Sequence, residues 1–224
     1  MNSEAIVDLS HRLGPQTPPF PGDGPVTIEV MDSIRGGPND GRRHCNSSRL
    51  NTSMHCGTHM DAPFHFFNDG KTIDTVPLNV CVGPAALVSH PAWTAHATIE
   101  PAHLEPQRAI IKTARRIVMN SGWSRRFGQD GYFTDHPVIS GACAQWLVDL
   151  GVVLVGVDFP SVDRPPHLAH DVLLGNGLVI VENLTNLDEI GSPVFELCAL
   201  PLAVVGRDGS PVRAIGRALG GEDG

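Results

Sequence analysis

The feature that most constrains this chain is an eleven-residue segment, HCGTHMDAPFH, that begins at His55 and carries many possible metal ligands. It contains three histidines and Asp61, and no lysine or arginine within it could neutralise the carboxylate. His55 and His59 have the i, i+4 spacing that would place two histidines on one face of a helix. Gly57 and Pro63 disfavour a helix, so a loop or a strand end must aim these side chains.

Two imidazoles and one carboxylate form a common ligand set for zinc, manganese or iron(II), with coordination positions left open for water or substrate. A lone histidine is more often packed or exposed than bound to a metal, so the inference rests on the clustering. We therefore predict that His55, His59 and Asp61 bind a divalent metal. Cys56 beside a histidine base is an alternative nucleophile, but a metal would occupy both neighbouring imidazoles.

Length and composition indicate one globular domain over residues 1–224. Hydrophobic residues make up 41% and charged residues 18% of the 224 positions, which is typical of a folded chain. The net charge is −8 and no long basic run is present, so nucleic acid is not expected as a partner.

The sequence also points to a cytoplasmic protein. The N-terminus lacks the basic and apolar regions of a signal peptide, and the longest apolar stretch is interrupted by Asp149 and Asp158, so no membrane association is expected. The five cysteines include no C-x-x-C pair, a pattern that favours reduced thiols.

Hydrophobic patterning predicts a strand-rich α/β fold with few helices. One helix is expected from Ser140, as N-cap, to Leu150, with Gly151 ending it. A second is expected to open at Pro166 and to end at Gly175 or Gly177, and a polar loop is expected from Asp32 to Arg43. The expected strands lie at 5–9, 26–30, 82–88, 152–157, 178–184, 195–206 and 211–216.

The segment from His55 to His65 matches all seven positions of H-x-G-T-H-x-D-x-P-x-H, and so resembles the cyclase family of metal-dependent hydrolases. This family includes bacterial kynurenine formamidases and isatin hydrolases. The resemblance covers nearly the whole chain, through VDLSHRLGPQTPPFPGD, SGWSRRFG, GVDFPSVD, HDVLLGNGLVIVENLTNL, ELCALPL and PVRA. It implies a strand-rich α/β fold of the swivelling β/β/α type and a homodimer or higher homo-oligomer.

The resemblance also implies roles for individual side chains. The first metal would be held by His55, His59 and Asp61, a second by His170 and Glu182 with Asp61 shared, and His65 would be the acid–base group. A buried lone carboxylate at Glu182, which ends an apolar run, would cost several kcal/mol without a partner; the alternative is that it faces solvent. His167 competes with His170, but its proline neighbours favour the surface or the pocket rim.

These roles imply hydrolysis of a C–N amide bond by metal-activated water, with His65 moving the proton. One or two zinc or manganese ions per chain would be the cofactor. The substrate would be a small-molecule amide, either an aryl formamide or a cyclic amide such as isatin. Formamidases of the family tend to read TPVWPGD where this chain reads TPPFPGD, so we expect Phe20 to form an aromatic pocket wall.

Two other functions use the same residues. The chain could be a metal-dependent cyclase or isomerase of a carbonyl substrate, or a non-catalytic metal-binding protein. The presence of His65 argues against the second alternative, because a binding site alone needs no acid–base group.

Overall fold

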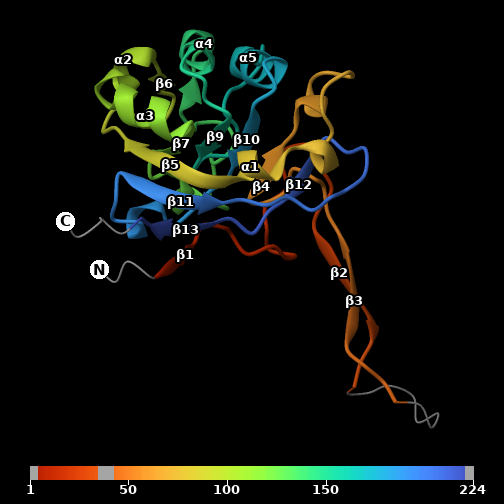
Figure 1. The fold of residues 1–224 in the computed structure, drawn as a ribbon. Helices are drawn as coiled ribbons and strands as arrows, with labels where there is room; N and C mark the ends of the chain where they lie inside the picture. The colour runs from red at the N-terminus through yellow and green to blue at the C-terminus, as the bar shows by residue number, and fades with distance from the viewer. Residues whose placement is uncertain (1–4, 35–42, 220–224) are drawn as a thin grey trace.

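The computed structural model describes residues 5–34 and 43–219, and its framework is one nine-stranded mixed sheet (Figure 1). Four central strands run parallel and the outer pairs are antiparallel. In spatial order the strands are β1 (Ile6–Asp8), β13 (Ile215–Ala218), β11 (Val194–Cys198), β5 (Val82–Ser89), β7 (Arg116–Asn120), β9 (Leu154–Val157), β10 (Val179–Glu182), β4 (His59–Asp61) and β12 (Gly209–Pro211).

Four helices gather on one side of this sheet, as Figure 1 shows. They are α2 (Pro101–Leu104), α3 (Arg108–Ala114), α4 (Gly141–Asp149) and α5 (Leu168–Gly175), with the one-turn α1 (Leu78–Cys81) leading into β5. Short 3₁₀ turns are η1 (Pro63–His65), η2 (Ile73–Thr75), η3 (Glu105–Gln107), η4 (Trp123–Arg126) and η5 (Leu187–Glu189). In the described part of the chain, no helix is long and apolar enough to cross a membrane.

Two small sheets complete the architecture. The strands β6 (Thr98–Ile99) and β8 (Val138–Ile139) pair in parallel beside the helices. The strands β2 (Thr27–Asp32) and β3 (Ser47–Asn51) form an antiparallel hairpin that projects away from the rest of the molecule (Figure 1).

The central strands are buried on both faces, and successive residues serve different cores. Val179 and Val181 of β10 belong to the apolar cluster on the side away from the helices, whereas Ile180 packs in the cluster beneath α4 and α5. This alternation follows from the two-residue repeat of a strand. Glu182 continues the pattern and therefore points to the helix-covered side.

The fold class predicted from the sequence, strand-rich α/β, is confirmed. The helix expected from Ser140 is present, and the Ser140 side chain caps it by accepting from Cys143 N. The second helix begins at Leu168 rather than at Pro166, because His167 has a left-handed φ of 63°. Of the strand expected over 195–206, only the start is strand. The polar loop expected from Asp32 to Arg43 lies largely outside the described residues.

Candidate metal centre

The pairing of β4 with β10 brings the central side chains of the site together. In the register of this antiparallel pair, His59 lies opposite Glu182, Met60 opposite Val181 and Asp61 opposite Ile180. Directly opposed residues share a face of the sheet, so His59, Asp61 and Glu182 all point to the helix-covered side. Met60 points to the other core and is fully buried there.

Neighbouring segments add the remaining donors. His170 lies on α5 and is buried, while His55 precedes a turn at Gly57, whose φ is 66°. Strand β12 pairs with the other edge of β4 and places Gly209 opposite Asp61. A Cβ at Gly209 would lie 2.8 Å from His55 Cε1, so glycine at this position makes room for the imidazole.

Asp61 lies between two groups of possible ligand atoms. Its Oδ1 is 2.7 Å from His55 Nδ1 and 3.3 Å from His59 Nε2, and its Oδ2 is 3.9 Å from His170 Nε2. Glu182 also faces two imidazoles: Oε2 is 3.4 Å from His59 Nε2 and Oε1 is 3.7 Å from His170 Nε2. Two groups of donor atoms share Asp61, one of His55, His59 and Asp61 and one of Asp61, His170 and Glu182.

In two imidazoles, the ring nitrogen that points away from Asp61 and Glu182 donates to a hydrogen-bond acceptor, and this fixes the tautomer of the ring. His59 Nδ1 lies 2.9 Å from the Gly57 carbonyl, which can only accept, so this nitrogen carries the proton. His170 Nδ1 lies 2.6 Å from Asp163 Oδ1 and donates to that carboxylate. In a neutral ring the other nitrogen, Nε2, then has a free lone pair, and in both residues it faces the carboxylates.

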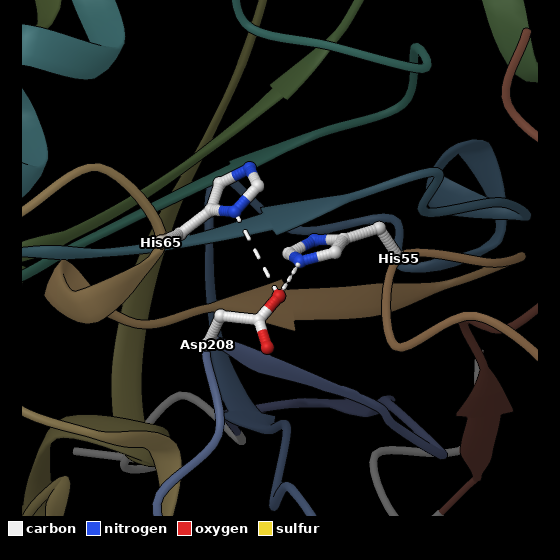
Figure 2. A group of neighbouring side chains, drawn as sticks. All are labelled: His55, His65 and Asp208. Carbon is white, nitrogen blue, oxygen red and sulfur yellow. Dashed lines mark hydrogen bonds and ion pairs between the residues drawn. The ribbon is translucent and has the colours of Figure 1, made fainter. Parts of the chain in front are cut away.

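His55 has carboxylates at both nitrogens. Its Nδ1 faces Asp61, and its Nε2 is 2.6 Å from Asp208 Oδ2. Figure 2 shows an Asp208 carboxylate oxygen facing both His55 and His65. The Asp208 backbone carbonyl accepts from Ala62 N, which holds the end of β12 beside the segment that follows β4.

The charges of the site call for a cation. Burial and the charge of Asp61 raise the pKa of Glu182. Burial opposes ionisation of Asp61 too, but the neighbouring His59 and His55 hold its pKa well below the usual range. Within residues 5–34 and 43–219, no arginine or lysine pairs with either carboxylate. Without a metal, only protonated imidazoles can balance these charges. Accordingly, although burial lowers the pKa of His55, Asp61 and Asp208 raise it to about 9.

His65 differs from the three candidate ligand histidines, His55, His59 and His170. It ends the 3₁₀ turn that begins at Pro63, and its ring stacks on His55 with centroids 4.0 Å apart. Its Nδ1 is 3.9 Å from Asp208 Oδ2, which is outside hydrogen-bond distance. Burial lowers its pKa to about 4. His65 is therefore a neutral imidazole at pH 7 that can accept a proton.

A pocket of about 480 Å³ opens onto these groups. Phe20 and Phe66 form aromatic walls, and the ring of Phe66 stacks on His170 at 4.7 Å. His167 also lines the pocket and lies 3.0 Å from Asp163 through its Nδ1. Cys56 instead lines a separate cavity of about 320 Å³, away from this pocket. The thiol is therefore poorly placed to act as a nucleophile in the His65 pocket.

The donor set fits a divalent metal. Imidazoles with fixed tautomers, two buried carboxylates and an accessible pocket are what an open metal site requires. All the residues predicted from the sequence for this site, namely Phe20, His55, His59, Asp61, His65, His170 and Glu182, line this pocket or contact residues that do. Sequence reasoning missed Asp163 and Asp208, which stand behind two of the imidazoles.

Fold and site together define a strand-rich α/β protein with a candidate metal centre at one end of its sheet. A family model described as putative cyclase matches residues 7–164. The chain belongs to this cyclase family, as the His55–His65 signature indicates.

Curated relatives match over the full length. The kynurenine formamidase of Bacillus mycoides (strain KBAB4) is 36% identical over 226 residues, with 98% of this chain and 100% of the relative covered. The kynurenine formamidase of Bacillus cereus is 35% identical over 225 residues, with the same coverage.

Solved structures confirm the fold. An isatin hydrolase bound to the product analogue thioisatinate superposes with a TM-score of 0.81 at 23% identity, covering 94% of this chain and 91% of that one. Isatin hydrolase A from Ralstonia solanacearum gives 0.83 at 23% identity, covering 96% and 92%. The fold is therefore the cyclase-family fold that the resemblance implied.

Proposed function

We propose that this protein is a metal-dependent hydrolase that cleaves the C–N bond of an aryl formamide or of a cyclic amide such as isatin. The observation that carries the proposal is the convergence of three imidazoles and two buried carboxylates beside the neutral His65, in a pocket with aromatic walls. The full-length relationship to kynurenine formamidases supports amide hydrolysis.

The first metal would be held by His55, His59 and Asp61, and a second by Asp61, His170 and Glu182. We propose zinc or manganese, in one or two ions per chain. When bound, the metal supplies a Lewis acid that polarises the scissile carbonyl. His65 takes a proton from the water as the C–O bond forms, and returns it to the leaving nitrogen as the C–N bond then breaks. A formamide yields formic acid and an amine, whereas a cyclic amide opens to one product that carries both a carboxyl and an amino group.

The pocket favours substrates without a negative charge near its mouth. Asp23 and Asp208 are the charged side chains at its exposed edge, and no lysine or arginine is present among the described residues that line it. An anionic substituent would meet repulsion there, whereas a neutral aromatic ring can pack on Phe20 and Phe66.

A proton-release assay over formanilide, N-formylanthranilate, isatin and simple lactams tests this function. We expect metal-dependent acid release from a neutral aryl amide, with the carboxylate-bearing N-formylanthranilate cleaved less efficiently. In Asp23→Asn, kcat/KM for N-formylanthranilate should rise several-fold and that for formanilide should stay the same. Conversion of a carbonyl compound without acid release would indicate an isomerase, and binding without turnover of any substrate would indicate a metal-binding protein.

We propose that the chain is one catalytic domain over residues 1–224, that it works in the cytoplasm, and that it pairs with a second copy through the β2–β3 hairpin. All five cysteines are unpaired, as expected of a reducing compartment.

Ile28 lies opposite Leu50 on one face of the hairpin, with Val30 next along that face, and these side chains are 47%, 52% and 69% exposed. The other face carries the Glu29–Arg49 ion pair. A two-stranded hairpin is marginal alone in water, so this apolar face needs a partner.

Light scattering after size-exclusion chromatography measures the assembly. We expect a dimer, or a multiple of one, for the wild-type protein and a monomer for the double variant Val30→Lys, Leu50→Lys. Thr27→Lys, on the opposite face of the same hairpin, should leave the mass unchanged. A monomeric wild-type protein, or a dimer that tolerates both lysines, would contradict the proposal.

A further inference from the structure

A buried hydrogen-bond chain leads from the protein interior to the candidate ligand His59. The Tyr132 hydroxyl donates to Asn183 Oδ1 at 2.7 Å, and Asn183 Nδ2 donates to the Gly57 carbonyl at 2.9 Å. The same carbonyl accepts from His59 Nδ1 at 2.9 Å. Tyr132 and Asn183 are 1% and 4% exposed, so water does not replace these contacts.

Asn183 also connects the two parts of the site. It directly follows Glu182 at the end of β10, and its backbone carbonyl accepts from Thr58 Oγ1 at 2.6 Å. Its side chain and its backbone therefore both hold the turn at Gly57 and Thr58. The strand that ends at Glu182 is thereby fastened to the turn between His55 and His59.

The chemistry of this position selects asparagine. The backbone has a φ of 58°, in the left-handed region that asparagine tolerates better than most residues. One side-chain atom must accept from Tyr132 while the other donates to Gly57, and the uncharged amide of asparagine does both. Glycine would suit the backbone but would leave the Gly57 carbonyl held by His59 alone.

We propose that Asn183 and Tyr132 are positioning residues for the metal centre. They fix the Gly57 carbonyl, which sets the tautomer and the orientation of His59, so that Nε2 faces Asp61 and Glu182. This role rests on the proposed metal dependence. Groups of this kind behind a ligand histidine typically change metal affinity or activity by about 10- to 100-fold when they are removed.

The variants Asn183→Gly and Tyr132→Phe test the role of this hydrogen-bond chain, with Asn186→Gly as the matched control. Asn186 has a φ of 56°, and its amide donates to the Asp8 carbonyl, away from the metal centre. Glycine therefore removes the same side chain at the same backbone conformation in both places. Tyr132→Phe deletes one oxygen atom and keeps the ring, so it carries the test even if Asn183→Gly fails to fold.

Two measurements need only a metal ion and no substrate. Zinc affinity is measured by competition with a chromophoric chelator, and cobalt(II) added to metal-free protein reports the geometry of the site through its visible spectrum. We expect a loss of zinc affinity of roughly 10- to 100-fold and an altered cobalt spectrum in Asn183→Gly. A loss of a few-fold is expected in Tyr132→Phe and no change in Asn186→Gly. In turnover, kcat should fall while KM stays the same.

The outcomes separate this inference from the proposed function. If the wild-type protein binds zinc and both variants keep its affinity and its cobalt spectrum, the positioning role is overturned and the metal centre stands. If Asn186→Gly weakens zinc binding as much as Asn183→Gly, the effect is general destabilisation and the positioning role is again overturned. If the wild-type protein binds neither metal, the proposed function fails and this role with it.

Discussion

Replacement of Asp61 by alanine is expected to abolish both metal binding and turnover. Asp61 is 1% exposed and offers one oxygen to His55 and His59 and the other to His170. Its loss removes a ligand from both candidate ion positions and leaves fewer than the three protein ligands of an open site at either of them. His55→Ala and His59→Ala should release the ion of the first position for the same reason.

Metal content by plasma emission spectroscopy and the rate of acid release are to be measured on the same preparations. Asp149→Ala is the control, because Asp149 is an exposed aspartate at the end of α4, remote from the pocket lining. A variant Asp61→Ala or His59→Ala that stays fully loaded and active would overturn the ligand assignment.

Replacement of His65 by alanine is expected to keep the metal and to lower kcat by about two to four powers of ten, the usual contribution of a general acid–base group. The pKa of His65 is lowered to about 4 by burial, so its imidazole is neutral and able to take a proton over the neutral pH range. It lies outside the two ligand sets that share Asp61, and its possible ligand atom groups instead with those of His55 and Asp208. The expected loss is therefore in turnover and not in metal content.

His167→Ala is the matched control for His65→Ala. His167 lines the same pocket but follows the prolines at its rim, so its removal should affect kcat much less. Loss of the ion in His65→Ala would show that His65 is a ligand and that the division of roles is wrong. Retention of both ion and full rate would assign the proton transfer to another group, with Glu182 the first to examine.

Four residues of the site could be predicted from the sequence because they lie close to one another along the chain. His55, His59, Asp61 and His65 lie within one segment, and the ligand chemistry of that segment is visible without the fold. Asp208 is 153 positions from His55, and only the pairing of β12 with β4 brings them together. Nothing in the local sequence around Asp208 indicates this contact.

Helices and strands were likewise predictable where the signal is local in sequence and were missed or misplaced where it is not. The helix over Ser140–Leu150 was predictable because its cap and its terminating glycine are neighbours in sequence. Strand β3, which reads SSRLN, was missed because its side chains are polar or exposed and it pairs only within the hairpin. The start of α5 was misplaced because His167 has a left-handed φ, which leaves Pro166 and His167 outside the helix.

The measurement that tests the central claim most directly is the titration of metal-free protein with zinc or manganese while acid release from a neutral aryl amide is followed. The protein is predicted to be inactive without metal and to recover its rate as ions bind, with up to two ions per chain and one in Glu182→Ala. Full activity in the metal-free protein, or recovery of the rate by metal in Asp61→Ala, would contradict the claim that this chain hydrolyses amides through a metal held by His55, His59 and Asp61.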